Sequence, residues 1–206
     1  MIRKTHTTAI ILAGGRSTRL GHDKRQLRLW GTAGPTLLAH TVQRAAALCD
    51  PVLVILHDPE QWAALSAPGI VLLRDAYPGD GPLGGLATGL AASSTPRALL
   101  LACDMPLLPV PLLGWLADHT DDADALVLAA ADGRPEPLVA RYATHCLPQV
   151  TTLLAAGERR MTALLNTIQP TLLPPRTWQN LDPAGHALLN LNRAEDLDRI
   201  ARIIAG

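Results

Sequence analysis

The feature that most constrains the fold is a series of short apolar runs separated by stretches with helical periodicity. The runs occupy residues 9–12, 52–56, 70–73, 99–103 and 126–130. Uninterrupted apolar runs of this length are typical of strands buried on both faces of a parallel sheet. Right-handed crossovers through the intervening helices place such strands in one sheet, with helices on both sides. The sequence therefore predicts an α/β fold, a three-layer α/β/α sandwich around a mostly parallel sheet.

The segments between and after these runs supply the remaining expected elements. Helical spacing of apolar residues predicts helices at 36–49, 59–65, 109–119 and 145–156, and Thr36 is placed to cap the first. Short strands are expected at 27–30 and 137–142. The proline-rich stretch 170–185 is interpreted as irregular and flap-like. A last helix is expected after Asn192, with Glu195 reaching back to complete a capping box.

Length and composition narrow the class of protein. A chain of 206 residues with 48% apolar residues can form one α/β domain with a sizeable core. Its formal net charge of zero argues against nucleic acid as the main partner, because binding a phosphate backbone usually needs a basic surface. No apolar run reaches the roughly 20 residues of a membrane-spanning helix, and residues 1–6 do not look like a signal peptide. We therefore expect no membrane partner and a cytoplasmic location.

The three cysteines, Cys49, Cys103 and Cys146, are far apart in the sequence and form no Cys-x-x-Cys pair. This spacing makes a disulfide framework or a zinc site an unfavourable interpretation. We expect buried thiols instead.

A glycine-containing stretch follows the first apolar run. It reads Leu12-Ala13-Gly14-Gly15-Arg16-Ser17-Thr18-Arg19-Leu20-Gly21-His22-Asp23-Lys24. Backbone N–H groups around the glycines can bind phosphate oxygens, and Arg19 and Lys24 add positive charge. A glycine turn with solvated cations explains the same residues, so the spacing alone leaves both interpretations open. No Gly-Lys-Ser/Thr closes the stretch, which excludes a P-loop.

Two carboxylates stand at the ends of apolar runs. Asp75 follows the run at 70–73, and Asp104 follows the run at 99–103. Ligands of parallel α/β sheets bind outside the carboxyl ends of the strands, so one crevice can hold both residues and the glycine stretch. Asp104 is the best metal candidate, because Mg²⁺ prefers one or two carboxylates together with phosphate oxygens. A turn at a strand end, or a helix cap before Pro106, explains the same carboxylates without any ligand.

Several of these segments together resemble the MobA-type molybdenum cofactor guanylyltransferases, within the nucleotidyltransferase superfamily. The resembling segments are 12–15, 23–24, 81–85 and 103–106, and they occur in the family's order across roughly residues 8–199. The resemblance implies a Rossmann-like sheet and Mg²⁺-dependent transfer of GMP from GTP to the terminal phosphate of molybdenum-bound molybdopterin. It also implies one domain over 1–206, with a nucleotide-binding half at 8–130 and an acceptor-side half at 131–206.

The same resemblance implies roles for individual residues. Arg19, Lys24 and Asp104 are expected to be catalytic, and Asp104 to bind the metal. The expected nucleotide-binding residues are Leu12, Ala13, Gly14, Gly15, Lys24, Asp75 and Asp104. The expected acceptor-binding residues are Gly81, Pro82, Arg159, Arg160, Asn190 and Asn192. A helix end also explains Arg159 and Arg160, and a helix cap also explains Asn192. Other molybdenum cofactor biosynthesis proteins and apo-molybdoenzymes are the implied protein partners.

The sequence departs from the family's pattern at three places. The family often has Asn just after its second strand, where this chain has His57-Asp58, which puts guanine specificity in doubt. It commonly has His or Gln where this chain has Glu136, an extra negative charge that disfavours a phosphate acceptor. Arg25 is a further cation where a small residue is usual.

Other functions fit parts of the sequence. Gly79-x-Gly81-x-x-Gly84, with Asp104 20 residues beyond the last glycine, matches the fingerprint of an NAD-binding dehydrogenase. Residues 75–78 loosen the tight turn that this motif needs, and Pro82 removes a backbone donor, so both count against it. A cytidylyltransferase acting on molybdopterin, a sugar-1-phosphate nucleotidyltransferase and a non-catalytic nucleotide-binding regulator remain alternatives.

Overall fold

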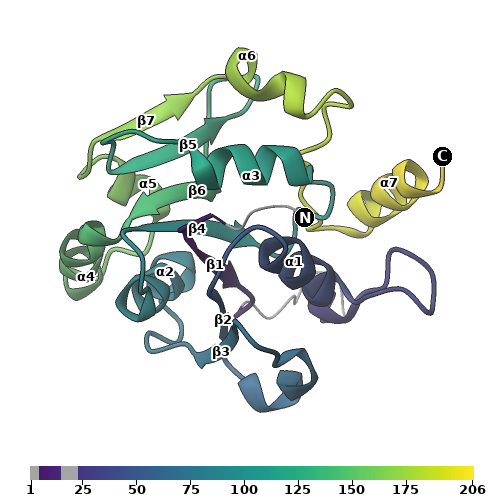
Figure 1. The fold of residues 1–206 in the computed structure, drawn as a ribbon, viewed down its shortest axis with the longest axis horizontal. Coiled ribbons are helices and arrows are strands. Elements are labelled where there is room, and N and C mark those ends of the chain that lie inside the picture. The colour runs from purple at the N-terminus through teal and green to yellow at the C-terminus, as the bar shows by residue number, and fades with distance from the viewer. Residues whose placement is uncertain (1–4, 15–22) are drawn as a thin grey trace.

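A seven-stranded sheet organises the protein, which is represented by a computed structural model that describes residues 5–14 and 23–206 (Figure 1). The strands are β1 (Thr8–Leu12), β2 (Val52–Leu56), β3 (Ile70–Arg74), β4 (Arg97–Ala102), β5 (Ala125–Ala129), β6 (Pro135–Ala143) and β7 (Pro170–Leu173). Their order in the sheet is β3-β2-β1-β4-β6-β5-β7. The two pairings of β6 are antiparallel and the other four are parallel. The predicted mostly parallel sheet is therefore confirmed.

Helices cover both faces of this sheet. The α-helices are α1 (Leu37–Ala46), α2 (Gly81–Ala92), α3 (Val110–Asp118), α4 (Leu147–Ala155), α5 (Met161–Leu165), α6 (Pro175–Trp178) and α7 (Ala194–Ala205). Short 3-10 helices are η1 (Lys24–Gln26), η2 (Pro59–Leu65), η3 (Thr144–Cys146) and η4 (Gln179–Leu181). One apolar core lies between the sheet and helices α1 and α3, and a second lies between the sheet and helices α2, α4 and α5. This arrangement confirms the three-layer sandwich.

The alternation of side chains along β1 connects the two cores. Ala9 and Ile11 point into the core beneath α1 and α3, whereas Ile10 points into the core beneath α2. All three residues are fully buried. A strand buried on both faces favours apolar residues at successive positions, which explains the apolar run at 9–12 of β1.

Helix α2 is absent from the sequence-based expectations because glycine lowers helix propensity. The packing of α2 on β1 explains why glycine is used there. A Cβ atom on Gly89 would lie 2.5 Å from Cγ2 of Ile10, and one on Gly85 would lie 2.7 Å from Cδ2 of Leu12. These glycines let the helix approach the strand more closely than any other residue would allow.

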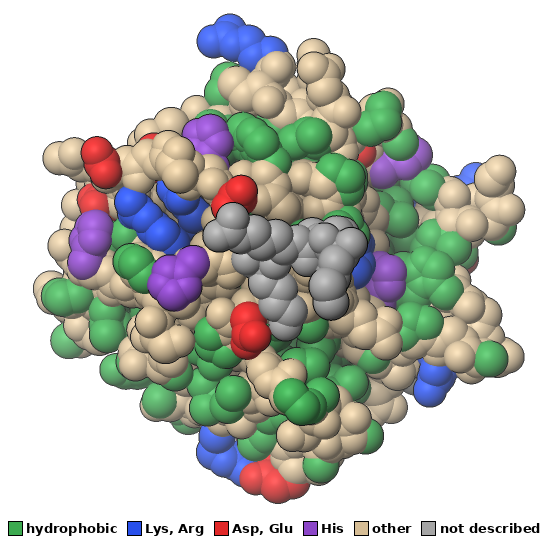
Figure 2. Space-filling model, in the orientation of Figure 1, with side chains coloured by type: hydrophobic (Ala, Val, Ile, Leu, Met, Phe, Trp, Pro, Cys, Tyr) green, Lys and Arg blue, Asp and Glu red, His purple; other side chains and the backbone are tan. Residues whose placement is uncertain are grey.

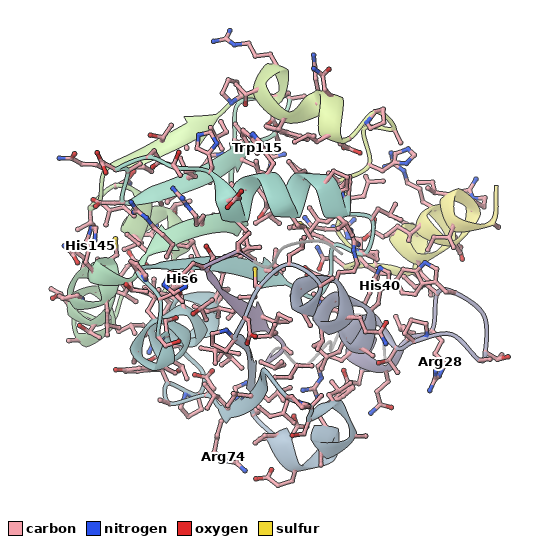
Figure 3. The ribbon with its side chains drawn as sticks, viewed as in Figure 1. His6, Arg28, His40, Arg74, Trp115 and His145 are labelled. Carbon is pink, nitrogen blue, oxygen red and sulfur yellow. The ribbon has the colours of Figure 1, made fainter. Side chains whose placement is uncertain are left out.

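The expected strand at 27–30 is wrong. The backbone carbonyl of Leu27 accepts a hydrogen bond from the N–H of Leu37, at the start of α1. Trp30 stacks on His40 of α1, with ring centroids 3.7 Å apart (His40 is labelled in Figure 3). The segment therefore packs on a helix instead of joining the edge of the sheet.

Two expectations for the C-terminal region also need correction. The stretch 170–185 is not wholly irregular, because β7 lies parallel to β5 and is followed by α6. Pro170 is tolerated because it is the first residue of an edge strand. The last helix begins at Ala194, and Asp196, not Glu195, accepts hydrogen bonds from the backbone N–H groups of Asn192 and Arg193.

None of the helices in the described ranges has the length and apolar character needed to cross a membrane. Charged side chains occur in small groups separated by apolar and uncharged ones on the face shown in Figure 2.

Candidate active site

A cavity of about 610 Å³ opens at the carboxyl ends of β1, β2, β3 and β4. Eight residues expected at the site line this cavity: Leu12, Ala13, Gly14, Lys24, Asp75, Gly81, Pro82 and Asp104. The other lining residues are Ile55, His57, Gly79, Gly85, Ala102, Cys103 and Leu138. Gly15 and Arg19 lie outside the described residues. Parallel strands thus bring together the segments whose ends were expected to share one crevice.

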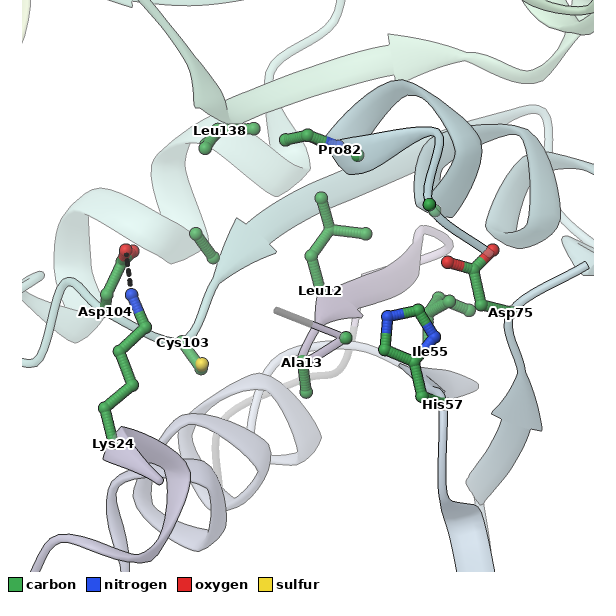
Figure 4. A pocket seen from close by; sticks show the side chains of 15 residues that line it. Leu12, Ala13, Lys24, Ile55, His57, Asp75, Pro82, Cys103, Asp104 and Leu138 are labelled. Atoms are coloured by element: carbon green, nitrogen blue, oxygen red, sulfur yellow. Dashed lines mark hydrogen bonds and ion pairs between the residues drawn. The ribbon is translucent and has the colours of Figure 1, made fainter. Parts of the chain in front are cut away.

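Lys24 and Asp104 face each other on one side of the cavity (Figure 4). The first is in η1 and the second is in the turn after β4. Lys24 Nζ lies 2.7 Å from Asp104 Oδ2, and the two side chains are only 17% and 16% exposed. The N–H of Leu191 donates to the backbone carbonyl of Asp104, which fixes this turn against the segment before α7.

The second carboxylate oxygen of Asp104 fits a bound cation. Oδ1 is buried and has no hydrogen-bond partner among the described residues. A buried carboxylate oxygen without a partner is costly unless a ligand satisfies it. Mg²⁺ is bound by one or two carboxylates and completes its shell with water and phosphate oxygens. The donor set present at Asp104 is compatible with that ion.

Asp75 and His57 lie on the opposite side of the same cavity (Figure 4). Asp75 is buried, and its Oδ1 accepts hydrogen bonds from the N–H of Tyr77 and the hydroxyl of Thr88 in α2. The ring of His57 covers Gly14, because a Cβ atom at Gly14 would lie 3.4 Å from His57 Nε2. These two side chains flank the end of the cavity farthest from Lys24.

The N-terminus of α2 forms another wall of the cavity. Gly79 and Gly81 have φ angles of +93° and +64°, a conformation that favours glycine. The first turn of a helix carries a partial positive charge and unpaired N–H groups, which favour anions such as phosphate. Gly81 and Pro82 therefore lie where an anionic substrate would be stabilised.

Arg159 and Arg160, although adjacent, make different contacts. Arg159 Nε donates to Asp80 Oδ1 at 2.7 Å, which brings its guanidinium to the residue preceding α2. Arg160 pairs with Glu158 at 2.6 Å. The hydrogen bonds from Arg160 lower the pKa of Glu158 to about 2. Of the two arginines, Arg159 is thus connected to the cavity wall.

Glu136 lies at the start of β6, where its register partner is Leu128 of β5. Burial raises the pKa of its carboxyl group, and the charge of Asp104 adds to that effect. The side chain of Asn190 lowers this pKa, which places one of the expected acceptor residues close to Glu136. Asn192 is exposed, and its backbone N–H is bonded to Asp196. Asn190 and Asn192 both flank Leu191, whose N–H is bonded to the backbone carbonyl of Asp104, so this segment passes the turn that carries Asp104.

Cys103 also lines the cavity. Burial raises the pKa of its thiol to about 12. A thiol with such a pKa is not a useful nucleophile near neutral pH. All three cysteines are buried thiols, as expected.

A second group of ligand-type side chains lies away from this cavity. One ligand atom from each of Asp124, His145 and Cys146 lies within 4.8 Å of the others (His145 is labelled in Figure 3). Asp124 Oδ1 already contacts His145 Nε2, and Oδ2 accepts from the N–H of Gln169. Burial raises the pKa of the Cys146 thiol to about 11. These contacts satisfy the group internally and disfavour metal binding.

The geometry also bears on the dinucleotide fingerprint at Gly79–x–Gly81–x–x–Gly84. Its glycines follow β3 and its acid, Asp104, follows β4. These two strands are separated in the sheet by β2 and β1. A dinucleotide fingerprint needs its βαβ unit to be compact, so the match does not indicate an NAD site.

Comparisons with known proteins agree with this geometry. The model of the MobA-like NTP transferase domain matches residues 9–171. The chain belongs to this family. A relative from Chloroflexus aggregans, named "Probable molybdenum cofactor guanylyltransferase", is 43% identical over 92% of this chain and 91% of its own length. As a member of this family, the protein is a nucleotidyltransferase.

Solved structures support the fold of the family. Molybdopterin-guanine dinucleotide biosynthesis protein A from Archaeoglobus fulgidus has a TM-score of 0.82 and is 22% identical, covering 97% of this chain and 99% of its own. The 4-diphosphocytidyl-2C-methyl-D-erythritol synthase of Anaerococcus prevotii has a TM-score of 0.71 at 11% identity, covering 98% of this chain and 97% of its own. Nucleotidyltransferases with different names thus share this fold.

Sequence reasoning missed part of the site. Leu138 and Ile55 line the cavity, but an isolated leucine or an isoleucine in a buried strand carries no chemical signal. Leu138 reaches the site because β6 runs antiparallel to β4, which places the start of β6 beside the end of β4. Only the strand order reveals that placement.

Proposed function

We propose that the protein transfers GMP from GTP to the terminal phosphate of molybdenum-bound molybdopterin, forming the guanine dinucleotide cofactor and pyrophosphate. The observation that carries this proposal is the Lys24–Asp104 pair, 2.7 Å apart in a cavity bordered by the N-terminus of α2. The names of the relatives support the choice of nucleotide and acceptor.

The chemistry needs little activation of the nucleophile. A phosphate monoester has a second pKa near ~6 and is mostly dianionic at pH 7. One of its oxygens attacks the α-phosphorus of GTP, and the bond from that phosphorus to the bridging oxygen of pyrophosphate breaks. The main obstacle is repulsion between two polyanions, so positioned positive charge is the catalytic requirement. The cavity supplies such charge through Lys24 and the N-terminus of α2. The reaction needs no side-chain nucleophile, and the buried Cys103 thiol, whose pKa is raised, is not one.

Several residues have defined tasks in this proposal. Lys24 leaves its contact with Asp104 to neutralise phosphate oxygens, and Arg19 assists it. Leu12, Ala13, Gly14, Gly15 and Asp75 bind the nucleotide. Gly81, Pro82, Arg159, Arg160, Asn190 and Asn192 are the proposed acceptor residues. Asp104 holds Mg²⁺, which supplies Lewis-acid stabilisation of phosphate charge when bound.

A cytidylyltransferase on molybdopterin is the second candidate. His57 lies over Gly14 at a position where the resembling family often has Asn, and a protein with a cytidylyl name shares the fold. A sugar-1-phosphate acceptor would use the same nucleotide site.

We also propose a cytoplasmic location. The proposed partners are molybdenum cofactor biosynthesis proteins and apo-molybdoenzymes. The proposed nucleotide-binding half is 8–130 and the proposed acceptor-side half is 131–206.

Pyrophosphate release tests the proposal. The protein is assayed with Mg²⁺ and each of the four ribonucleoside triphosphates, with and without molybdenum-loaded molybdopterin. We expect release from GTP that depends on the pterin and collapses in Lys24→Ala and Asp104→Asn. A preference for CTP would change the nucleotide but keep the mechanism. If none of the four nucleotides gave pterin-dependent pyrophosphate release, both molybdopterin reactions would be excluded.

A further inference from the structure

Arg25, the residue after Lys24, is not among the residues that line the cavity. Its side chain is only 8% exposed. Nη1 donates to the carbonyl of Ala13 at 3.0 Å and to Asp58 Oδ1 at 2.8 Å. Nη2 donates to Asp23 Oδ2 at 2.7 Å and to Asp58 Oδ2 at 3.1 Å. One buried guanidinium therefore has three separate anchors.

These anchors belong to three segments at the cavity. Ala13 directly follows β1, Asp58 lies just after β2, and Asp23 directly precedes η1. Arg25 therefore joins Ala13, at the end of β1, to Asp23 and to the segment after β2. The guanidinium further lies 5.2 Å from the ring centroid of Trp62 in η2.

The geometry points to Arg25 as a positioning residue that holds Lys24 in place for phosphate binding through its contacts with Ala13, Asp23 and Asp58. This inference rests on the proposed nucleotide-transfer function of the cavity. Arg25 acts through Lys24 and does not touch substrate. Lys24 is in the same single turn, η1, so the contacts that fix Arg25 also fix the backbone that carries the catalytic amine.

The chemistry of the guanidinium suits this task. Its planar fork matches a carboxylate with two parallel hydrogen bonds, as seen with Asp58, and a lysine or a neutral side chain cannot reproduce both. Hydrogen bonds to Asp23 and Asp58 outweigh burial and keep the pKa of Arg25 above its usual value. An arginine side chain is protonated at neutral pH in any case, so these ion pairs are present under ordinary conditions.

The contact also links two unusual features of the sequence. Arg25 stands where the resembling family has a small residue, and His57-Asp58 stands where it often has Asn. The structure joins these positions in one ion pair. Without Arg25, Asp58 would lose this ion-pair partner, and without Asp58 the buried Arg25 would keep Asp23 as its ion-pair partner. Losing part of a buried charge network is costly, so the two residues are expected to depend on each other.

Lysine labelling provides a test that needs no substrate. The sequence contains two lysines, Lys4 and Lys24, so Lys4 serves as an internal reference. Lys24 is acetylated at pH 8 with an excess of reagent, and the ratio of modification at Lys24 to that at Lys4 is read by mass spectrometry. Wild-type protein is compared with Arg25→Gln, Asp58→Asn and the double variant. Arg176→Gln is the matched control, because Arg176 is an exposed arginine in α6.

All variants are labelled well below their measured unfolding temperatures, so that global unfolding does not contribute. We expect the Lys24 ratio to rise by more than about twofold in Arg25→Gln and Asp58→Asn, because local opening exposes the amine. The double variant should show no larger rise than Arg25→Gln, and Arg176→Gln should match wild type. The dissociation constant for Mg²⁺-GTP should also rise in Arg25→Gln and Asp58→Asn and should match wild type in Arg176→Gln.

A Lys24 ratio that stays within about twofold of wild type in folded Arg25→Gln would overturn the inference. If Arg25→Gln does not fold, the milder Asp58→Asn is judged by the same limit. Failure of GTP transfer would defeat the proposed function and leave the labelling result intact. If the protein transfers GMP from GTP but the Lys24 ratio does not change in the variants, only the role of Arg25 is contradicted.

Discussion

Lys24 and Asp104 are 80 positions apart in the sequence, yet Nζ of the first lies 2.7 Å from Oδ2 of the second. The sheet produces this contact, because the segment after β1 and the turn after β4 lie at neighbouring strand ends. The pair places a cation and an anion on one side of the cavity. In the proposed function, substrate phosphates would take Lys24 as partner and a metal ion would take Asp104.

Replacing either member of this pair should remove most of the transfer activity. We expect Lys24→Met and Asp104→Asn each to lower kcat by about 10²–10³-fold, the usual effect of deleting one group that stabilises charge in the transition state. Asp104→Asn should also weaken Mn²⁺ binding, measured by electron paramagnetic resonance, whereas Lys24→Met should not. Equal Mn²⁺ affinity in wild type and Asp104→Asn would contradict the metal role of Asp104.

Removing the charge of Glu136 should improve use of an anionic acceptor. Glu136 is a partly buried carboxylate near Asp104, and its negative charge repels a phosphate. In Glu136→Gln we expect the KM for the acceptor to fall by about two- to fivefold, the effect of relieving one modest like-charge repulsion. The KM for the nucleotide should change little, and Glu195→Gln, on the exposed side of α7, is the control. A rise in acceptor KM would mean that Glu136 binds the acceptor.

The two adjacent arginines should differ in their effect on the acceptor. Arg159 contacts Asp80 next to α2, whereas Arg160 contacts Glu158. We expect Arg159→Ala to raise the KM for the acceptor by about tenfold, as for the loss of one charge-assisted contact. Arg160→Ala should have a smaller effect, measured in the same assay. The reverse order would assign the acceptor contact to Arg160.

The close packing of α2 on β1 predicts a stability difference between two helical glycines. A Cβ on Gly89 would lie 2.5 Å from Ile10, whose side chain is fully buried. We expect Gly89→Ala to lower the free energy of unfolding by about 1–3 kcal/mol. At Gly114 in α3 the nearest atom would be 3.4 Å away, so Gly114→Ala should be neutral or stabilising by up to about 1 kcal/mol. Urea unfolding of both variants measures the difference.

His40 should make the protein less stable as the pH falls below neutral. Burial, with a contribution from Arg44, lowers the pKa of His40 to about 4. Below the usual histidine pKa of about 6.5, the unfolded chain binds a proton that the folded protein does not. The free energy of unfolding therefore falls as the pH is lowered through this window.

The variant His40→Phe keeps an aromatic ring against Trp30 and removes the titration. Urea unfolding from pH 7 to pH 4 should give a steeper loss of stability for wild type than for this variant. Identical slopes would show that His40 is protonated equally in the folded and unfolded states.

Local patterns in the sequence predicted the layers of the fold and the residues at strand ends that line the cavity. Uninterrupted apolar runs are needed wherever a strand is buried on both faces, so β1, β2 and β4 were evident from residue type alone. Asp75 and Asp104 were found because polar residues that follow such strands must lie at the carboxyl edge of a parallel sheet. The glycines after β1 followed from the same rule, whereas Lys24 was expected from its charge and from the family resemblance.

Tertiary structure decided what local patterns cannot encode. Helix α2 tolerates Gly85 and Gly89 only because β1 lies directly beneath it, a long-range contact that overrides helix propensity. Strand β6 brings Leu138 to the cavity because it enters the sheet antiparallel to β4. The ion pair of Arg25 and Asp58 depends on the adjacency of β1 and β2. Residue spacing fixes which side chains face a sheet, whereas strand order fixes which of them meet.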